Sequence, residues 1–493
     1  MKCIWLFLAF TFAGLIFQGH AQRSTFHYSM SVEGSITSLQ SIPFWMQANR
    51  FGSVPVAGPS VSIVGSLRKD YRTDRKRLVD WGLSFEGRGN AGKTAEFLLI
   101  EGYAKARLSI FEAKVGRAKS QIGLVDSTLS SGSIALSGNA LGIPKVDLAI
   151  PEFYSIPILG RRLAIKGNFV HGWLGKTDIR FGNAPPKLNT RFHMLSAYGR
   201  LGKPDSPLKL YAGINHMVLW GDEQQIFGDD FTIASKKAYF YVLTGKKVVG
   251  SENISKIGNQ LGSIDFGFDY DFPTVKLAVY RQHFYDKGAI RYLANLRDGL
   301  NGVSLTNKQP VTQKLQWRKL LLEVLFTKNQ AGEIWSPWTP SGPEHYYNHS
   351  VYADGYSYRG RGIGTPFITP RHMAREGQAS APQDYFINNR VFLTHLGVEA
   401  CYQRWTFTGK VSYSRNYGTY WTSDVEYFWF NNQRVPHDPG ENVFREVGQF
   451  SAYLEGKKKL SNGYRVRYST AFDVGNLLNN AWGGNVCVTK IFQ

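Results

Sequence analysis

The sequence predicts an all-β protein: a transmembrane antiparallel β-barrel of the outer-membrane type, with about 18 strands and a range of about 16–20. Three observations favour this class. Long runs alternate between apolar and polar residues, aromatic residues make up 14% of a chain that also has 51 Gly, and no segment beyond the N-terminus holds roughly 18 uninterrupted apolar residues. A membrane protein without such a helix has to cross as a closed barrel, because closure pairs every backbone N–H and C=O group.

Residues 263–272, SIDFGFDYDF, show the alternation most clearly. A period of two puts large apolar side chains on one face of a strand and carboxylates on the other. A tilted strand of about 10 residues crosses the apolar band of an outer membrane, and a charge facing mid-bilayer costs ~2–4 kcal/mol. We therefore expect two faces: Phe266, Phe268 and Tyr270 toward lipid, and Asp265, Asp269 and Asp271 toward the lumen.

Similar alternation recurs along the chain, at residues 81–86, 163–169, 208–215 and 464–474. Residues 392–413 predict a long hairpin, with the two-residue turn Gln403-Arg404 between strands whose apolar positions stay on one side. The last residues, 485–493, alternate in the same way and place an aromatic residue, Phe492, next to the C-terminus. This ending looks like the closing strand that bacterial barrel proteins present for membrane insertion.

Other connections are predicted to be long and irregular, at residues 221–235, 286–312, 329–349 and 368–386. Long loops that alternate with tight turns are typical of outer-membrane barrels, which keep the long loops outside and the short turns on the periplasmic side. No linker divides the chain, so we expect one barrel domain over residues 22–493. The soluble alternative, a pair of secreted β-sandwiches, would need a boundary near the middle.

Residues 1–21 are predicted to be a cleaved signal peptide. Lys2 provides a short positive region, Cys3 to Phe17 are apolar, and Gly19-His20-Ala21 fits a small-x-small cleavage site. The alternative is a transmembrane anchor, for which the apolar run is short. Export in this way predicts location in the bacterial outer membrane.

Charge and cysteine content limit the possible partners. The formal net charge is +21 at pH 7. An exported protein seldom meets nucleic acid, so a basic surface indicates anionic polysaccharide or lipopolysaccharide phosphates, with plain solvation as the alternative. Beyond the predicted signal peptide only Cys401 and Cys487 remain, which we expect to be free thiols rather than a disulfide.

The densest collection of aromatic and polar residues lies at residues 323–370. Sugar faces stack on aromatic rings, hydroxyl groups need polar partners, and Arg pairs with uronate or phosphate. The alternative for these aromatic residues is an interfacial girdle together with a packed loop plug. The predicted polysaccharide-binding residues are Trp335, Trp338, Tyr346, Tyr347, Tyr356, Tyr358, Arg359 and Arg361.

Other motifs give weaker signals. GRGIG at 360–364 lacks the Lys-Ser/Thr of a phosphate loop, and HYYNH at 345–349 lacks the Glu of a zinc-protease helix. The acidic loop at 222–230 has oxygen ligands for Ca²⁺, but a solvated acidic loop explains it better. Paired carboxylates for a hydrolase cannot be placed from sequence, and no nucleophile elbow is present. We expect no catalytic residue, no cofactor and no metal.

Four segments together resemble the bacterial capsule-assembly family Wzi in its Bacteroidetes-type form: residues 129–153, 323–335, 354–367 and 384–397. The resemblance extends from about residue 25 to the C-terminus. It implies an 18-stranded outer-membrane barrel that is occluded, and a lectin-like role in holding exported capsular polysaccharide at the cell surface. The best-known form has a periplasmic helical bundle before the barrel, whereas here the strand pattern already begins at residues 26–35.

The combined expectation is a monomeric, non-catalytic outer-membrane lectin that binds capsular or other anionic surface polysaccharide and assists capsule assembly. Its other partners would be outer-membrane lipid, including lipopolysaccharide, and the barrel-insertion machinery. The first alternative is a porin-like channel for sugars or anions. Two others are an outer-membrane hydrolase and a structural barrel that acts through protein partners.

Overall fold

The computed structural model describes most of the chain between Phe26 and Phe492. The residues outside this description are 1–25, 73–77, 94, 159, 247, 249–255, 287–291, 313, 334–335, 339–343, 426, 437–439 and 493. The predicted signal peptide, residues 1–21, and the predicted binding residue Trp335 therefore lie outside the described residues.

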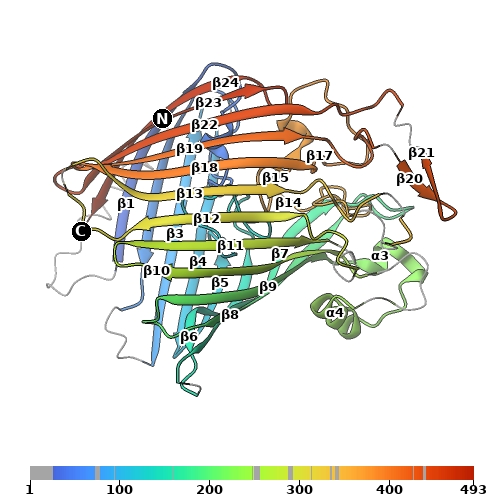
Figure 1. Cartoon of the computed structure of the whole chain (residues 1–493), viewed down its shortest axis with the longest axis horizontal. Helices are drawn as coiled ribbons and strands as arrows, with labels where there is room; N and C mark the ends of the chain where they lie inside the picture. The colour runs from blue at the N-terminus through green and yellow to red at the C-terminus, as the bar shows by residue number, and fades with distance from the viewer. Residues whose placement is uncertain are drawn as a thin grey trace, which may run out of the picture.

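Eighteen antiparallel strands form one closed sheet (Figure 1). In chain order they are β1 (Phe26–Thr37), β2 (Ser60–Lys69), β3 (Val79–Ala91), β4 (Glu96–Leu108), β5 (Phe111–Arg117), β6 (Lys145–Ser155), β7 (Leu163–Asp178), β8 (Lys187–Leu201), β9 (Leu208–Trp220), β10 (Asn259–Asp271), β11 (Val275–Tyr285), β12 (Gly299–Asn307), β13 (Gln316–Phe326), β18 (Val391–Tyr402), β19 (Trp405–Asn416), β22 (Val447–Lys459), β23 (Tyr464–Gly475) and β24 (Ala481–Phe492). Each strand pairs with its neighbours in the chain, and β1 closes the barrel by pairing with β24, from Tyr28–Phe492 to Thr37–Gly483. The predicted barrel and its strand number are confirmed.

The two ends of the barrel differ in the length of their connections. The start of β1 and the end of β24 lie side by side at one end of the barrel, where the strands are joined by short turns; we call it the turn end (Figure 1). The predicted turn Gln403-Arg404 is there, between β18 and β19. The opposite end, the loop end, carries the long connections, which are residues 38–59, 118–144, 221–258, 286–298, 327–390 and 417–446. By the usual arrangement of such barrels, the turn end faces the periplasm and the loop end the cell exterior.

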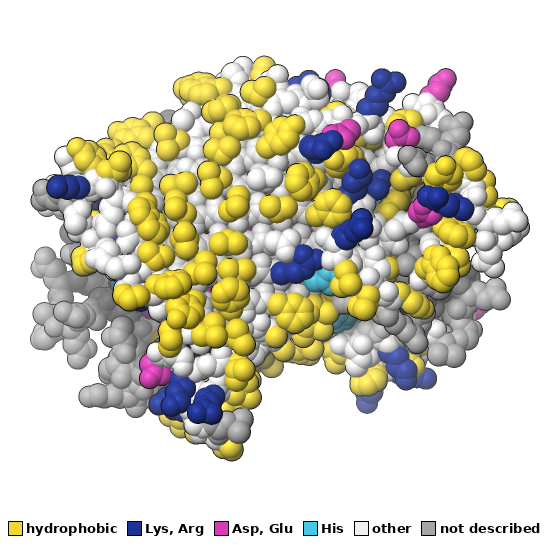
Figure 2. Space-filling view, viewed as in Figure 1, with side chains coloured by type: hydrophobic (Ala, Val, Ile, Leu, Met, Phe, Trp, Pro, Cys, Tyr) yellow, Lys and Arg dark blue, Asp and Glu magenta, His cyan; other side chains and the backbone are white. Residues whose placement is uncertain are grey.

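The outer face of the barrel is apolar, as the alternation predicts. Phe266 is 53% exposed, whereas the neighbouring Asp265 is fully buried and accepts hydrogen bonds from the Tyr198 hydroxyl (2.8 Å) and the Gln282 amide (2.9 Å). Hydrophobic side chains cover most of the strand region in Figure 2, while Lys and Arg gather toward the loop end. Phe492, in the closing strand, is also exposed on the outside.

Three loops from the loop end fold into the barrel and fill it; we call them together the plug. They are residues 38–59, which include helix α2 (Phe44–Gln47), residues 118–144, and residues 327–390. The third loop holds the short strands β14 (Ser357–Tyr358), β15 (Arg361–Gly362), β16 (Thr369–Pro370) and β17 (Phe386–Asn388), and the 3-10 turn η3 (Arg371–Met373). Buried residues of all three loops share one hydrophobic core with inward-facing residues of the wall. Where the plug lies, the inner face of the barrel wall therefore packs against plug residues instead of lining a water-filled lumen.

Two of the other long loops contain short elements of their own. Residues 221–258 contain α3 (Glu223–Phe227), η1 (Gly228–Asp230) and α4 (Ser235–Thr244), and the 417–446 loop contains the hairpin β20 (Tyr427–Phe430) and β21 (Gln433–Pro436). The prediction that residues 286–312 are irregular is wrong in the second half of this range, where β12 forms. Its alternation is hard to see because Leu300 faces the plug and Asn301 faces outward, where it accepts a hydrogen bond from Arg281 (2.7 Å).

Two further findings concern helices and thiols. Within the described residues, no helix is long and apolar enough to cross a membrane. Cys401 and Cys487 are free thiols, as predicted.

Candidate functional site

The structure separates the predicted binding residues into exposed and buried ones. Trp338 is 77% exposed and Arg359 is exposed at the loop end. The others that the structure describes are at most 7% exposed and lie inside the plug: Tyr346, Tyr347, Tyr356, Tyr358 and Arg361. A polymer outside the barrel therefore reaches only the first two directly.

The buried tyrosines hold the plug together. The Tyr347 hydroxyl donates to the Ile134 carbonyl oxygen (2.6 Å), and the Tyr356 hydroxyl bonds the Ala135 carbonyl oxygen (3.0 Å). These bonds join the 327–390 loop to the 118–144 loop. The alternative role predicted for these aromatic residues is a packed loop plug, and that role accounts for their positions. Their binding of polysaccharide stays a prediction.

A groove of about 610 Å³ opens at the loop end, where β7 ends beside the third plug loop. Ile179 forms an isolated bridge with Tyr352, and the Ala353 N–H donates to the Asp178 carbonyl oxygen (2.9 Å). These bonds extend β7 across the mouth of the barrel. Across the groove, the Arg371 N–H bonds the Tyr385 carbonyl oxygen (2.9 Å), which brings η3 beside the start of β17. We call this space the mouth groove.

One side of the mouth groove is aromatic and apolar. The rings of His372 and Tyr385 lie 6.0 Å apart, edge to face, and Tyr385 in turn packs against the buried Phe386 at 5.0 Å. Pro186 and Pro382 add apolar surface. Because the Tyr385 ring is half-buried and braced from below, it offers a fixed surface on which a sugar ring can stack.

The rim of the mouth groove is polar and carries both signs of charge. Arg180 is exposed, and Arg371 uses one nitrogen, Nη2, to bond the carbonyl oxygens of Ala381 (2.7 Å) and Asp384 (2.9 Å). Asp354 accepts from the Asp178 N–H (3.3 Å), and its burial raises the pKa of the Asp354 carboxyl. Guanidinium donors and carboxylate acceptors around an aromatic surface are suited to hydroxyl and acid groups of sugars.

Sequence reasoning missed Arg180, Arg371, His372 and Tyr385 as binding residues. The only signal was the prediction of 368–386 as a long, irregular loop. Nothing in the spacing joins residue 180 to residue 385, because the contact depends on where the third plug loop crosses the mouth of the barrel.

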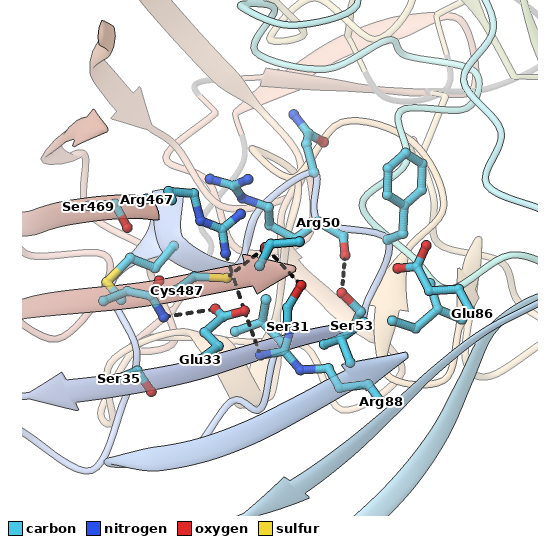
Figure 3. Close-up of a pocket in the computed structure, with 18 of the residues that line it drawn as sticks. Ser31, Glu33, Ser35, Arg50, Ser53, Glu86, Arg88, Arg467, Ser469 and Cys487 are labelled. Carbon is cyan, nitrogen blue, oxygen red and sulfur yellow. Dashed lines mark hydrogen bonds and ion pairs between the residues drawn. The ribbon is translucent and has the colours of Figure 1, made fainter. Parts of the chain in front are cut away.

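A second cavity, of about 340 Å³, lies between plug residues 46–54 and the wall (Figure 3). In Figure 3 the Glu33 carboxylate stands between Arg88 (3.4 Å) and Arg467 (3.2 Å). Arg50, from the plug, also lines this chamber and pairs with Glu455 (3.5 Å). Lys119 in turn pairs with Glu86 (2.6 Å). Since each of these four basic residues already has a carboxylate partner, the chamber is a weaker candidate for an anionic ligand than the mouth groove.

The two motifs considered as metal or calcium ligands, HYYNH at 345–349 and the acidic loop at 222–230, form no such site among the described residues. Within the described part of the chain, no group of three or more His, Cys, Asp or Glu side chains is arranged to hold a metal ion. Glu223 of the acidic loop is buried and accepts from the Gly221 N–H (2.7 Å), while Asp222 accepts from the Asn189 N–H (3.1 Å). His345 bonds the Asp384 carboxylate (2.8 Å). These side chains serve the packing of the loops.

Asp298 is the last residue of the loop before β12 and bonds to the plug. Its titration makes a measurable, pH-dependent contribution to the free energy of unfolding. Its carboxylate accepts from the Tyr346 hydroxyl (2.6 Å) and the Gln330 N–H (2.7 Å), and burial raises the pKa of Asp298 to about 6. The folded state therefore binds more protons than the unfolded state between about pH 4 and pH 6. We expect the free energy of unfolding to fall as the pH rises through this window, by up to about 1.4 kcal/mol per pH unit from this group.

The measurement is urea unfolding in detergent at several pH values, compared between the wild type and Asp298→Asn. The Asn side chain does not titrate, so the free energy of unfolding of the wild type minus that of Asp298→Asn should fall as the pH rises from about 4 to about 6. Parallel curves would show that Asp298 does not titrate in this range.

Comparison with known proteins gives one family and several structures. Residues 24–370 match the family model described as capsule assembly protein Wzi. No curated protein matches the chain. Solved structures that are similar to it include OccK5 (OpdH) of Pseudomonas aeruginosa, at 10% identity, covering 95% of this chain and 97% of that one, with a TM-score of 0.46. OccAB2 of Acinetobacter baumannii is similar at 9% identity, covering 95% and 98%, with a TM-score of 0.45. Likenesses at this level say nothing about ligand or transport.

Proposed function

The chain belongs to the capsule assembly protein Wzi family, and from this premise we propose that it is an outer-membrane lectin: it binds capsular polysaccharide at the cell surface, without catalysis. It is a β-barrel of the outer membrane, and by the usual arrangement of such barrels its loop end faces the cell exterior. The Bacteroidetes-type form and the monomeric state stay predictions. We also retain residues 1–21 as a cleaved signal peptide and residues 22–493 as one barrel domain.

The observation that carries the proposal is the mouth groove. It is open at the loop end, its volume of about 610 Å³ lies in the range of small-ligand sites, and it combines the Tyr385 ring with charged groups of both signs. Trp338 and Arg359, also exposed at this end, add contacts outside the groove. A repeating polymer that meets several such weak contacts gains avidity without a deep pocket.

The first experiment measures capsule retention. In a strain that lacks this protein, we expect polymer to be released into the medium instead of staying on the cells, and the wild-type gene should restore retention. Normal retention in the deletion strain would remove the main support for the lectin function.

The second experiment locates the site. We expect Arg180→Ala and Tyr385→Ala each to weaken binding of purified capsular polymer by about five- to thirtyfold, which corresponds to the loss of one charged hydrogen bond or one stacking contact. Trp338→Ala combined with Arg359→Ala tests the outer contacts in the same assay, and we expect a smaller loss.

The matched control is Arg297→Ala, which removes an exposed arginine of the 286–298 loop that does not line the groove. The barrel of each variant is checked by its resistance to SDS without heating. If the two groove variants bind like the wild type while the Trp338 and Arg359 variant does not, the site lies on the outer loops instead.

A further inference from the structure

Helix α4 (Ser235–Thr244) stands outside the barrel, against its outer wall. The side chains of Val218 and Trp220 on β9 face away from the lumen and share a small hydrophobic core with Ala238 and Val242 of α4. His216, on the same outward face of β9, bonds the Val242 carbonyl oxygen through Nε2 (3.1 Å). Figure 1 shows α4 near the loop-end termini of β8 and β9, away from the plug. The helix is thus fixed to the wall and is not part of the lumen.

The two faces of α4 differ in chemistry. The residues that pack on the wall, Ala238, Tyr241 and Val242, follow helical spacing and are buried. Lys237 and Phe240 are three positions apart on the opposite side, with Lys236 beside them, and all three are exposed. Phe240 is 53% exposed. At the place of α4, Figure 2 shows dark-blue side chains next to a hydrophobic one.

The height of α4 on the wall matches the edge of the apolar band. Leu208, Leu210 and Ile214 on β9 face outward and are each more than 40% exposed, as lipid-facing residues are. The next outward positions toward the loop end, His216 and Val218, are covered by α4 and its flanking loop. The helix therefore sits directly above the lipid-facing surface, at the outer boundary of the membrane.

Among the residues that the structure describes, no carboxylate pairs with the lysines of this surface. Lys236, Lys237 and Lys246 are exposed, no acidic residue lies in the first turn of α4, and none of the three lysines forms an ion pair within the described residues. Lys237 and Lys246 converge on the Tyr241 ring, at 5.9 Å and 5.5 Å from its centre. Three exposed lysines and the exposed Phe240, on this helix and just after it, form a surface that favours phosphate groups next to acyl chains.

We propose that α4 is a docking surface for the phosphorylated glycolipid of the outer leaflet, with Lys236, Lys237 and Lys246 contacting its phosphates and Phe240 contacting the upper part of its acyl chains. Lysine binds phosphate as a point charge, and a basic helix with an apolar side chain at the same face lies in the plane of a membrane interface. The contact would fix the height of the barrel and orient the mouth groove relative to the cell surface. It depends on the outer-membrane location and not on polysaccharide binding.

The test uses the full-length protein in phosphatidylcholine nanodiscs with added lipid A, and native mass spectrometry to measure the lipid A that stays bound. We expect the wild type to retain lipid A, and the double variant Lys236→Glu with Lys237→Glu to retain it about ten- to thirtyfold more weakly. Phe240→Ser should weaken binding less. The matched control is Lys203→Glu, an exposed lysine in the turn between β8 and β9 at the opposite end of the barrel.

Two further lipids separate the possible sources of phosphate. Dephosphorylated lipid A should bind the wild type as weakly as lipid A binds the double variant, and phosphatidylglycerol should bind less tightly than lipid A. Equal retention of lipid A by the wild type and the double variant would overturn the proposal. The proposal would also be overturned if the wild type bound dephosphorylated lipid A as tightly as lipid A. Binding of phosphatidylglycerol as tight as that of lipid A would show a general anionic-lipid surface without preference for the glycolipid.

Discussion

Replacing Leu322 with Arg is expected to destabilise the barrel by about 2–4 kcal/mol, the cost of a charge that faces the middle of the bilayer. Leu322 lies near the centre of β13, faces outward and is 48% exposed. Its direct cross-strand partners, Val303 on β12 and Leu396 on β18, also face outward and carry no charge that could pair with the guanidinium. Folding into lipid vesicles, titrated with urea, measures the difference.

The control is Tyr402→Arg. Tyr402 also faces outward, at 44% exposure, but it lies at the turn end of β18 beside Gln403. An arginine near the interface costs only about 0–1 kcal/mol. If both substitutions cost the same small amount, the apolar face of the barrel does not meet hydrocarbon, and the membrane orientation is wrong.

The second large effect on stability is expected at Glu323, which follows Leu322 in β13 and faces the inside of the barrel. Glu323 is buried and accepts hydrogen bonds from the Ser130 hydroxyl (2.7 Å), the Ser131 N–H (2.6 Å) and the Tyr280 hydroxyl. Glu323→Ala leaves these buried donors without an acceptor. At about 1–3 kcal/mol for each unsatisfied group, partly relieved by relaxation and water, we expect a loss of about 2–5 kcal/mol in the free energy of unfolding.

Because Glu323 attaches the 118–144 loop to the wall, the same variant should loosen the plug. We expect the wild type to show no steady current in planar bilayers, and Glu323→Ala to show intermittent openings and faster proteolysis within residues 118–144. Glu323→Gln retains one acceptor oxygen and should have an intermediate effect. A steady open-pore current through the wild type would support the porin-like alternative, and identical proteolysis of all three proteins would show that Glu323 does not hold the plug.

The alternation of the sequence predicts the outer face well but the inner face only in part. Outward residues such as Phe266 and Leu396 follow the rule because every one of them meets lipid, a uniform environment. Near the loop end the rule reverses. There Met194 and Leu300 face the lumen and are buried against the plug, while His216 faces outward beneath α4. A period of two indicates that two faces differ; it contains no information about which loops come to cover them.

The residues of the mouth groove could not be predicted from the sequence, and most of them lie outside the aromatic stretch at 323–370. Aromatic side chains serve equally well for stacking on sugars and for filling a core, so the composition of residues 323–370 could not distinguish the two uses. The structure places Tyr347 and Tyr356 in the core. Tyr385 lies at the groove because the 327–390 loop crosses the lumen and returns to the mouth, which is a long-range contact without a local sequence pattern.

The filled lumen has a consequence for the order of events at the cell surface. A chain of sugars cannot be threaded through a cylinder whose bore is occupied by its own buried loops. On the proposed function, the polymer that binds at the loop end therefore has to reach the cell surface by a route other than this lumen. On this proposal the barrel retains polymer that is already outside the cell. The amount of polymer retained would then depend on the number of barrels at the cell surface and not on passage through any one of them.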